Sequence, residues 1–146
     1  MLDLVFRNAT SDPHTSYGEG FFESYILKTL GVVGVTERSE VSVTLVEVDR
    51  MRELNKQYRS IDKPTDVLSF PLGETLLPGY TIRTLGDIFI CPSYAREHAE
   101  KEGISLEKKM SWLIVHGTLH LLGYDHERSE KEDTEMSSLE KQILTS

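Results

Sequence analysis

The sequence has a single cysteine, few prolines and no long run of apolar residues. The lone cysteine, Cys91, excludes an internal disulfide framework and any cysteine-rich metal site. No stretch approaches the roughly 18 to 20 apolar residues that a membrane-spanning helix requires. The first residues include an acidic side chain and lack an apolar run behind a basic start, so we expect no signal peptide. These absences predict a cytoplasmic protein with no membrane partner.

Positive charge is also scarce. The chain has 24 acidic and 16 basic residues, which gives a net charge of −8. This balance argues against broad electrostatic capture of nucleic acid. Much of the acid is clustered near the C-terminal end, where we expect a solvated helical face. The cluster comprises Glu127, Glu130, Glu132, Asp133, Glu135 and Glu140.

The remaining composition is that of an ordinary globular protein. The chain has 146 residues, of which 38% are hydrophobic and 27% are charged. This length allows one hydrophobic core and is too short for two. We therefore predict a single domain over residues 1–146.

Hydrophobic periodicity predicts an alternating set of strands and helices. The strands are expected near residues 2–7, 41–48, 67–70 and 87–91, and the helices near 20–30, 49–59, 92–103, 105–123 and 130–144. The order β-α-β-α-β-β-α-α-α predicts an α+β (mixed α/β) fold with one mixed sheet of about four strands packed with about five helices. The order of strands within the sheet cannot be read from this pattern.

Several residues indicate where the elements begin and end. Gly31 is expected to end the first helix, and Asp49 and Ser105 to act as N-caps. Pro71 denies its strand a ladder hydrogen bond, so residues 67–70 are expected at a sheet edge. A loop is expected from Gly73 to Thr84, which includes Pro78 and Gly79.

Three of the five histidines fall within eleven residues. His116 and His120 are four apart in a helical pattern, so their side chains lie on one face and can converge on one ion. Gly123 can end the helix with a sharp turn that lets His126 return as a third ligand. Three imidazoles at about 2.0–2.1 Å leave tetrahedral Zn²⁺ one open position for water, as in catalytic zinc sites. The alternative is that these histidines are packing or surface residues.

The spacing of these residues also matches the H-E-x-x-H-x-x-G-x-x-H motif of metzincin proteases. Gly117, however, stands where those proteases have the glutamate that acts as general base. A metalloprotease is therefore a weaker hypothesis that rests on spacing alone.

Four sequence blocks extend the comparison beyond the histidines. They are LNKQYR at 54–59, DKPTDVLSFP at 62–71, GDI at 86–88 and HGTLHLLGYDH at 116–126. In content and order these blocks resemble the YbeY family of bacterial rRNA maturation factors. The resemblance implies a metzincin-like zinc helix and a zinc-dependent endoribonuclease specific for single-stranded RNA, with one zinc per chain. It further implies a role in 3′-end maturation of 16S rRNA and in ribosome quality control, with precursor rRNA and the ribosome or its proteins as partners.

A phosphodiester substrate would require a cation beside the metal. Arg59 is the candidate, because its guanidinium offers a planar fork of donors matched to phosphate and it lies in the shared LNKQYR block. The alternative is a surface arginine that pairs with Asp62 or Asp66. Zinc could polarise a phosphoryl oxygen or activate water, and the nucleophile could be that water or the substrate 2′-hydroxyl.

Other residues near these motifs have open roles. Asp125 and Glu127 could each orient an imidazole or cap a turn. Tyr58 and Trp112 could stack on bases, although packing is the commoner role for such residues. Ser69 and Phe70 are candidates to line the cleft, although Phe70 is expected to be a core residue.

A second function class is a ribosome assembly factor that binds RNA or ribosomal proteins and uses zinc only for structure. The net charge of −8 favours it, because an acidic surface suits protein partners better than RNA. Loss of RNA cleavage on chelation would distinguish the enzyme from this binding protein. Nickel or cobalt could occupy the same ligands.

Overall fold

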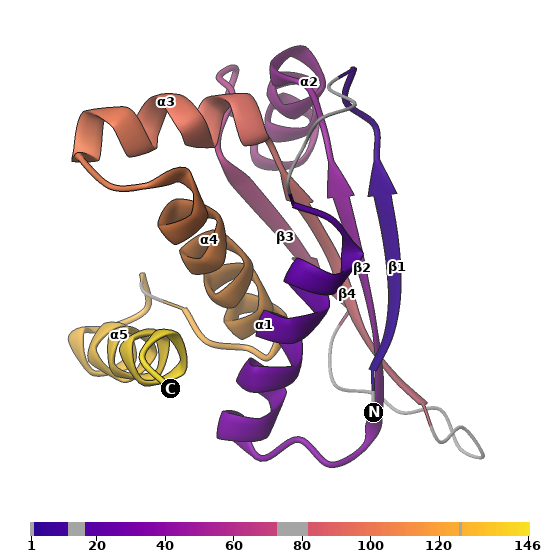
Figure 1. Ribbon diagram of the computed structural model, residues 1–146, viewed down its shortest axis with the longest axis vertical. Helices are drawn as coiled ribbons and strands as arrows, with labels where there is room; N and C mark the ends of the chain where they lie inside the picture. Colours follow the sequence, from indigo (N-terminus) through magenta and orange to yellow (C-terminus); the bar gives the residue numbers. More distant parts are fainter. Residues whose placement is uncertain (1, 12–16, 73–81, 126) are drawn as a thin grey trace.

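The structure is a computed structural model that describes residues 2–11, 17–72, 82–125 and 127–146. The predicted order of elements is confirmed (Figure 1). The strands are β1 (Leu2–Asn8), β2 (Arg38–Leu45), β3 (Val67–Pro71) and β4 (Ile82–Ile90). The helices are α1 (Glu19–Val33), α2 (Val48–Arg59), α3 (Pro92–Glu102), α4 (Leu106–Leu121) and α5 (Glu130–Leu144).

The strands form one mixed sheet with the order β1-β2-β4-β3. β2 pairs in parallel with both β1 and β4, whereas β3 pairs with β4 in the antiparallel direction. The α+β class with one mixed sheet is therefore confirmed, as is the position of β3 at a sheet edge. This edge position leaves one side of β3 available to side chains from other elements.

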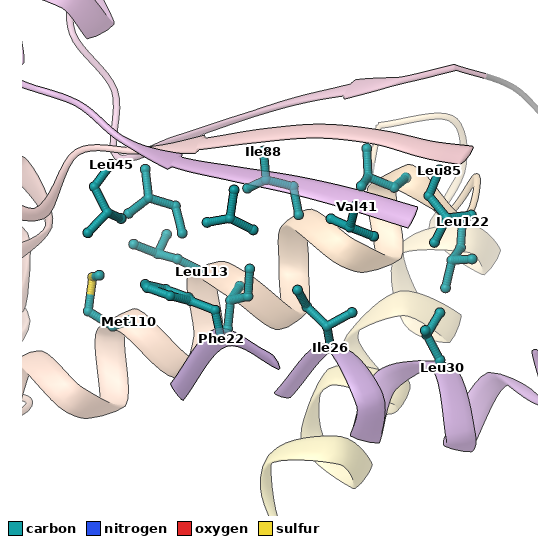
Figure 2. Close-up of a cluster of buried hydrophobic side chains, with 14 of the residues drawn as sticks. Phe22, Ile26, Leu30, Val41, Leu45, Leu85, Ile88, Met110, Leu113 and Leu122 are labelled. Atoms are coloured by element: carbon teal, nitrogen blue, oxygen red, sulfur yellow. The ribbon is translucent and has the colours of Figure 1, made fainter. Parts of the chain in front are cut away.

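Helices cover both faces of the sheet. α1 and α4 lie side by side on one face, and α5 lies beyond α4 (Figure 1). Between these helices and the sheet lies the main core, where Phe22 and Ile26 of α1 meet Val41 of β2, Ile88 of β4 and Leu113 of α4 (Figure 2). On the opposite face, Met51 and Leu54 of α2 pack with Leu68 of β3 in a smaller cluster. The sheet is thus held between two apolar layers.

Several predicted boundaries were wrong. The first helix passes through Gly31 to Val33, and Gly34 caps it in the left-handed conformation with φ of 88°. The second strand lies at 38–45 rather than 41–48, and the residue that precedes α2 is Glu47 rather than Asp49. Val33 and Val35 pack against the main core, and this burial outweighs the small entropic cost of a helical glycine.

The last strand also begins earlier than predicted. β4 starts at Ile82, so residues 82–84 of the predicted loop are strand. The rest of that loop, residues 73–81 with Pro78 and Gly79, lies outside the described residues. Ser105 caps α4 as predicted, since its Oγ accepts a hydrogen bond from the backbone N–H of Lys108 at 3.1 Å.

A β-bulge lies in the pairing of β2 with β4, next to a close contact between β4 and β3. The register shifts between Glu40 and Val41, which pair with Thr84 and Gly86 and leave Leu85 as the additional residue. Gly86 follows this bulge with φ of 140°, a conformation that side chains rarely adopt. A Cβ atom at Gly86 would overlap the carbonyl oxygen of Phe70. The sequence therefore needs glycine here for two independent reasons.

A Gly86→Ala variant is expected to be about 3 kcal/mol or more less stable, because backbone strain and overpacking add. For a chain of this size the melting temperature should fall by about 6–12 °C. Gly31→Ala is the matched control, because Gly31 is helical and has open space around it. That change should raise stability by about 0.5–1 kcal/mol. Equal melting temperatures for the two variants would contradict this account of Gly86.

Candidate functional site

The two described histidines of the predicted triad lie together on α4. The Nε2 atoms of His116 and His120 are 3.1 Å apart, and their rings meet edge to face with centroids 4.6 Å apart. Both side chains are partly buried. The helical repeat produces this approach, because residues four apart lie one turn apart on the same face.

The chain turns sharply directly after this helix. The N–H of Tyr124 donates to the carbonyl oxygen of Leu119 at 3.1 Å, and the N–H of Gly123 donates to that of His120 at 3.0 Å. Gly123 is left-handed with φ of 97°. These features make a Schellman motif, the helix ending expected of a glycine at this position. The helix therefore ends at Leu121, one residue after the second histidine.

The third predicted ligand, His126, lies outside the described residues. Within the described part of the chain, no group of three histidine, cysteine, aspartate or glutamate side chains is placed to hold a metal ion. The structure therefore supplies two converging imidazoles, and the three-histidine zinc site stays a prediction.

Gly117, between the histidines, brings α4 close to the sheet. A Cβ atom at this position would lie 3.1 Å from Ser69 Oγ and 3.2 Å from Ile88 Cγ2. Ser69 Oγ donates to the carbonyl oxygen of Gly117 at 3.3 Å, which ties the helix to the edge strand. A glutamate at this position, as in metzincins, would require the side chains of Ser69 and Ile88 to shift by a few tenths of an ångström. The packing therefore agrees with the lack of the protease general base.

Arg59 lies at the last position of α2 and reaches the exposed edge of β3. Its Nη2 donates to the carbonyl oxygen of Ser69 at 3.0 Å, and its guanidinium carbon lies 5.9 Å from the centre of the Phe70 ring. The two aspartates that were predicted as alternative partners are paired elsewhere. Asp62 pairs with Arg52 at 2.8 Å, and Asp66 lies 3.7 Å from the ammonium of Lys109.

Arg59 and the two histidines line the same cleft, which has a volume of about 460 Å³. The cleft is lined by residues of the edge strand, of α4 and of the turn after α4. The lining residues are Arg59, Ile61, Val67, Leu68, Ser69, Pro71, His116, His120, Gly123, Tyr124, Asp125, Glu127 and Arg128. The cleft thus places the guanidinium groups of Arg59 and Arg128 and two imidazoles around one cavity, a combination suited to an anionic substrate.

Asp125 caps the turn that follows α4. Its Oδ1 accepts a hydrogen bond from the backbone N–H of Glu127 at 2.8 Å. This bond holds the pKa of Asp125 below its ordinary value, and the nearby positive charge of Arg128 acts in the same direction. Of the two roles open to Asp125, the structure shows the turn-capping role. A carboxylate with a lowered pKa is ionised at neutral pH and is a weak proton acceptor.

Sequence reasoning missed Glu140 as a neighbour of the site. The acidic run was expected to be solvated, yet the Glu140 side chain is only 6% exposed and its Oε1 lies 3.5 Å from His116 Nδ1. Glu140 lies on the same stripe of α5 as Met136 and Ile143, which are both buried. A carboxylate on an apolar stripe is the signal that could have identified it.

Four more of the residues with open roles are placed differently from one another. Ser69 lines the cleft, and Trp112 stacks on His116 with ring centres 4.5 Å apart. Phe70 is half-buried and packs against Phe89. Tyr58 was expected to be mainly a packing residue, but it is 58% exposed and makes an edge contact with Phe70. Tyr58 lies in the last turn of α2, and its ring contacts the sheet through this edge contact.

Together the fold and the cleft define a small α+β protein with a two-histidine helix beside an edge strand. The family model described as Endoribonuclease YbeY matches residues 7–146. The chain therefore belongs to the YbeY family.

Individual relatives agree with this assignment. The chain is 50% identical over 105 residues to Endoribonuclease YbeY of a Sulfurihydrogenibium species, an alignment that covers 72% of this chain and 68% of the relative. It is 37% identical to Endoribonuclease YbeY of Acinetobacter baumannii over 98% of this chain and 92% of the relative. The solution structure of TM1509 from Thermotoga maritima superposes with a TM-score of 0.64 at 32% identity, covering 97% of this chain and 87% of that one.

Among the helices of the described residues, none has the length and apolar character needed to cross a membrane.

Proposed function

We propose that this protein is a zinc-dependent endoribonuclease that cleaves single-stranded RNA. The observation that carries the proposal is the shared cleft, where Arg59 at the end of α2 meets His116 and His120 of α4. The endoribonuclease name of the family and its relatives supports the reaction class. The resemblance to rRNA maturation factors extends the proposal to 3′-end maturation of 16S rRNA and ribosome quality control, in association with the ribosome.

The residues present suit zinc. Two nitrogens that bind one tetrahedral zinc at about 2.0–2.1 Å lie about 3.3–3.4 Å apart. The Nε2 atoms of His116 and His120 are separated by 3.1 Å, so an adjustment of a few tenths of an ångström would admit the ion. His126 is proposed as the third ligand, with one ion per chain. A bound zinc ion would act as a Lewis acid on a phosphoryl oxygen and would acidify a coordinated water.

The protein's own residues would bind and orient the phosphodiester. Arg59 is held by the Ser69 carbonyl through one N–H of its guanidinium, and a bidentate phosphate contact needs only two of the five N–H groups that an arginine carries. The guanidinium would thus meet charge that develops on the phosphoryl oxygens.

Proton acceptance has no assigned residue in this proposal. Asp125 and Glu127 are the carboxylates on the cleft wall, and Asp125 is committed to its turn. A substrate 2′-hydroxyl or a water molecule can serve as nucleophile. The products distinguish them, because a 2′-hydroxyl attack leaves a cyclic phosphate.

The test is cleavage of a single-stranded RNA oligonucleotide by the purified protein. We expect cleavage to stop when a chelator removes the metal and to return when zinc is added. The same oligonucleotide annealed to its complement should be cut at least about tenfold more slowly, since a rigid A-form helix displays its backbone differently from a single strand. Metal-independent cleavage would contradict the proposal. Ribosome binding without any cleavage would favour the assembly-factor alternative, which the net charge of −8 supports.

A further inference from the structure

Glu140 is a carboxylate buried in an apolar interface. The stripe of α5 that carries it also carries Met136 and Ile143, which pack against Val115 and Leu119 of α4. Burial of a carboxylate among such residues costs free energy unless a polar or charged partner offsets the cost. A carboxylate at this position therefore calls for a reason beyond packing.

The described contact supplies a partner in His116. Glu140 Oε1 lies 3.5 Å from Nδ1 of that ring, whereas Nε2 of the same ring faces His120 at 3.1 Å. The two nitrogens of His116 thus face different elements, α5 and the cleft. A carboxylate beside Nδ1 favours the tautomer with its proton on Nδ1, which leaves the Nε2 lone pair to bind a metal.

The plane of the His116 ring is also constrained. Trp112 lies one turn earlier on α4, and its ring stacks on His116 at 4.5 Å with 22° between the planes. The ammonium of Lys109 lies 5.3 Å from the centre of the Trp112 ring. The stacked Trp112 ring restricts the tilt of the imidazole. The Glu140 carboxylate, through its contact with Nδ1, restricts rotation of the imidazole within its own plane.

We propose that Glu140 is a positioning residue that holds His116 in the tautomer and orientation that bind the metal. This inference rests on the proposed zinc site. It makes α5 part of that site although the helix contributes no residue to the cleft lining. Loss of the carboxylate therefore weakens metal binding through His116.

The experiment compares zinc affinity, measured by competition with a chromophoric chelator, in the wild type and two variants of the full chain. Glu140→Gln preserves the shape of the side chain and one carbonyl acceptor, and it should weaken zinc binding about tenfold. Glu140→Leu removes the acceptor and should weaken it about a hundredfold. Glu135→Gln is the matched control, because Glu135 is exposed on the same helix, and its affinity should equal that of the wild type.

Melting curves with and without zinc separate positioning from packing. A packing role would shift both curves equally, whereas a positioning role reduces the rise that zinc produces. Unchanged zinc affinity in folded Glu140→Gln overturns the inference, and that variant decides the test if Glu140→Leu does not fold. A wild type that binds no zinc would instead remove the proposed metal site itself, so the two failures are distinguishable.

Discussion

A His120→Ala variant is expected to lose its bound zinc and at least about a thousandfold in the rate of RNA cleavage. The change removes one of two imidazoles whose Nε2 atoms converge at 3.1 Å. A catalytic zinc ion contributes several kcal/mol to the transition state, and each 1.36 kcal/mol is about tenfold in rate. Metal content by plasma mass spectrometry and single-turnover cleavage of a labelled oligonucleotide measure the two effects.

His98→Ala provides the matched control. His98 is a histidine of α3 that packs on Tyr94 with ring centres 4.4 Å apart, and it does not line the cleft. Its variant should keep both zinc and activity. Circular dichroism should show both variants folded, because both histidines are only partly buried and their truncation removes little packing. Full cleavage by rigorously purified, metal-free His120→Ala would show that these histidines do not serve the reaction.

Arg59→Ala should cut RNA about 100 to 1,000 times more slowly while it retains its zinc. The guanidinium donates to the carbonyl oxygen of Ser69, and Arg59 lines the same cleft as the two histidines. Loss of a preorganised donor to a developing oxyanion typically has an effect of this size. Arg59→Lys keeps the charge but not the planar fork, so it should recover only part of the rate. The measurement is kcat/KM together with metal content.

Arg52→Ala is the control for this prediction. Arg52 lies on the same helix and is exposed, but it pairs with Asp62 rather than with the edge strand. An exposed pair of this kind contributes little to stability, so we expect activity within about twofold of the wild type. Equal loss in the two variants would mean that the charge of α2 acts generally on RNA and that Arg59 has no particular role.

Local sequence predicted the order of elements because strand and helix periodicities differ and turn residues separate them. Boundaries were less accurate where two signals competed. Gly31 and Gly34 can each end a helix, and the choice depended on whether Val33 packs against the core. Likewise, the early start of β4 depends on pairing with β2 at Ile82, which a single strand does not reveal.

The buried carboxylate shows a different limit of prediction. Five acidic residues of the C-terminal run lie at least partly exposed, as solvation of a helical face predicts. Glu140 differs because its position on α5 coincides with the apolar stripe. Its contact with His116 exists only because α5 packs against α4. The helical period identifies the stripe, but the partner on the other helix depends on the packing.

The sequence by itself determined the features that depend on neighbours along the chain. The four-residue spacing placed His116 and His120 on one helical face, and Gly123 ended that helix soon after the second histidine. Only the tertiary structure decided that Arg59 and Glu140 join them. These contacts require the strand order β1-β2-β4-β3, which puts β3 at the edge beside α4, and the packing of α5 on α4. Both arise from burial of apolar faces against distant parts of the chain, which local periodicity does not specify.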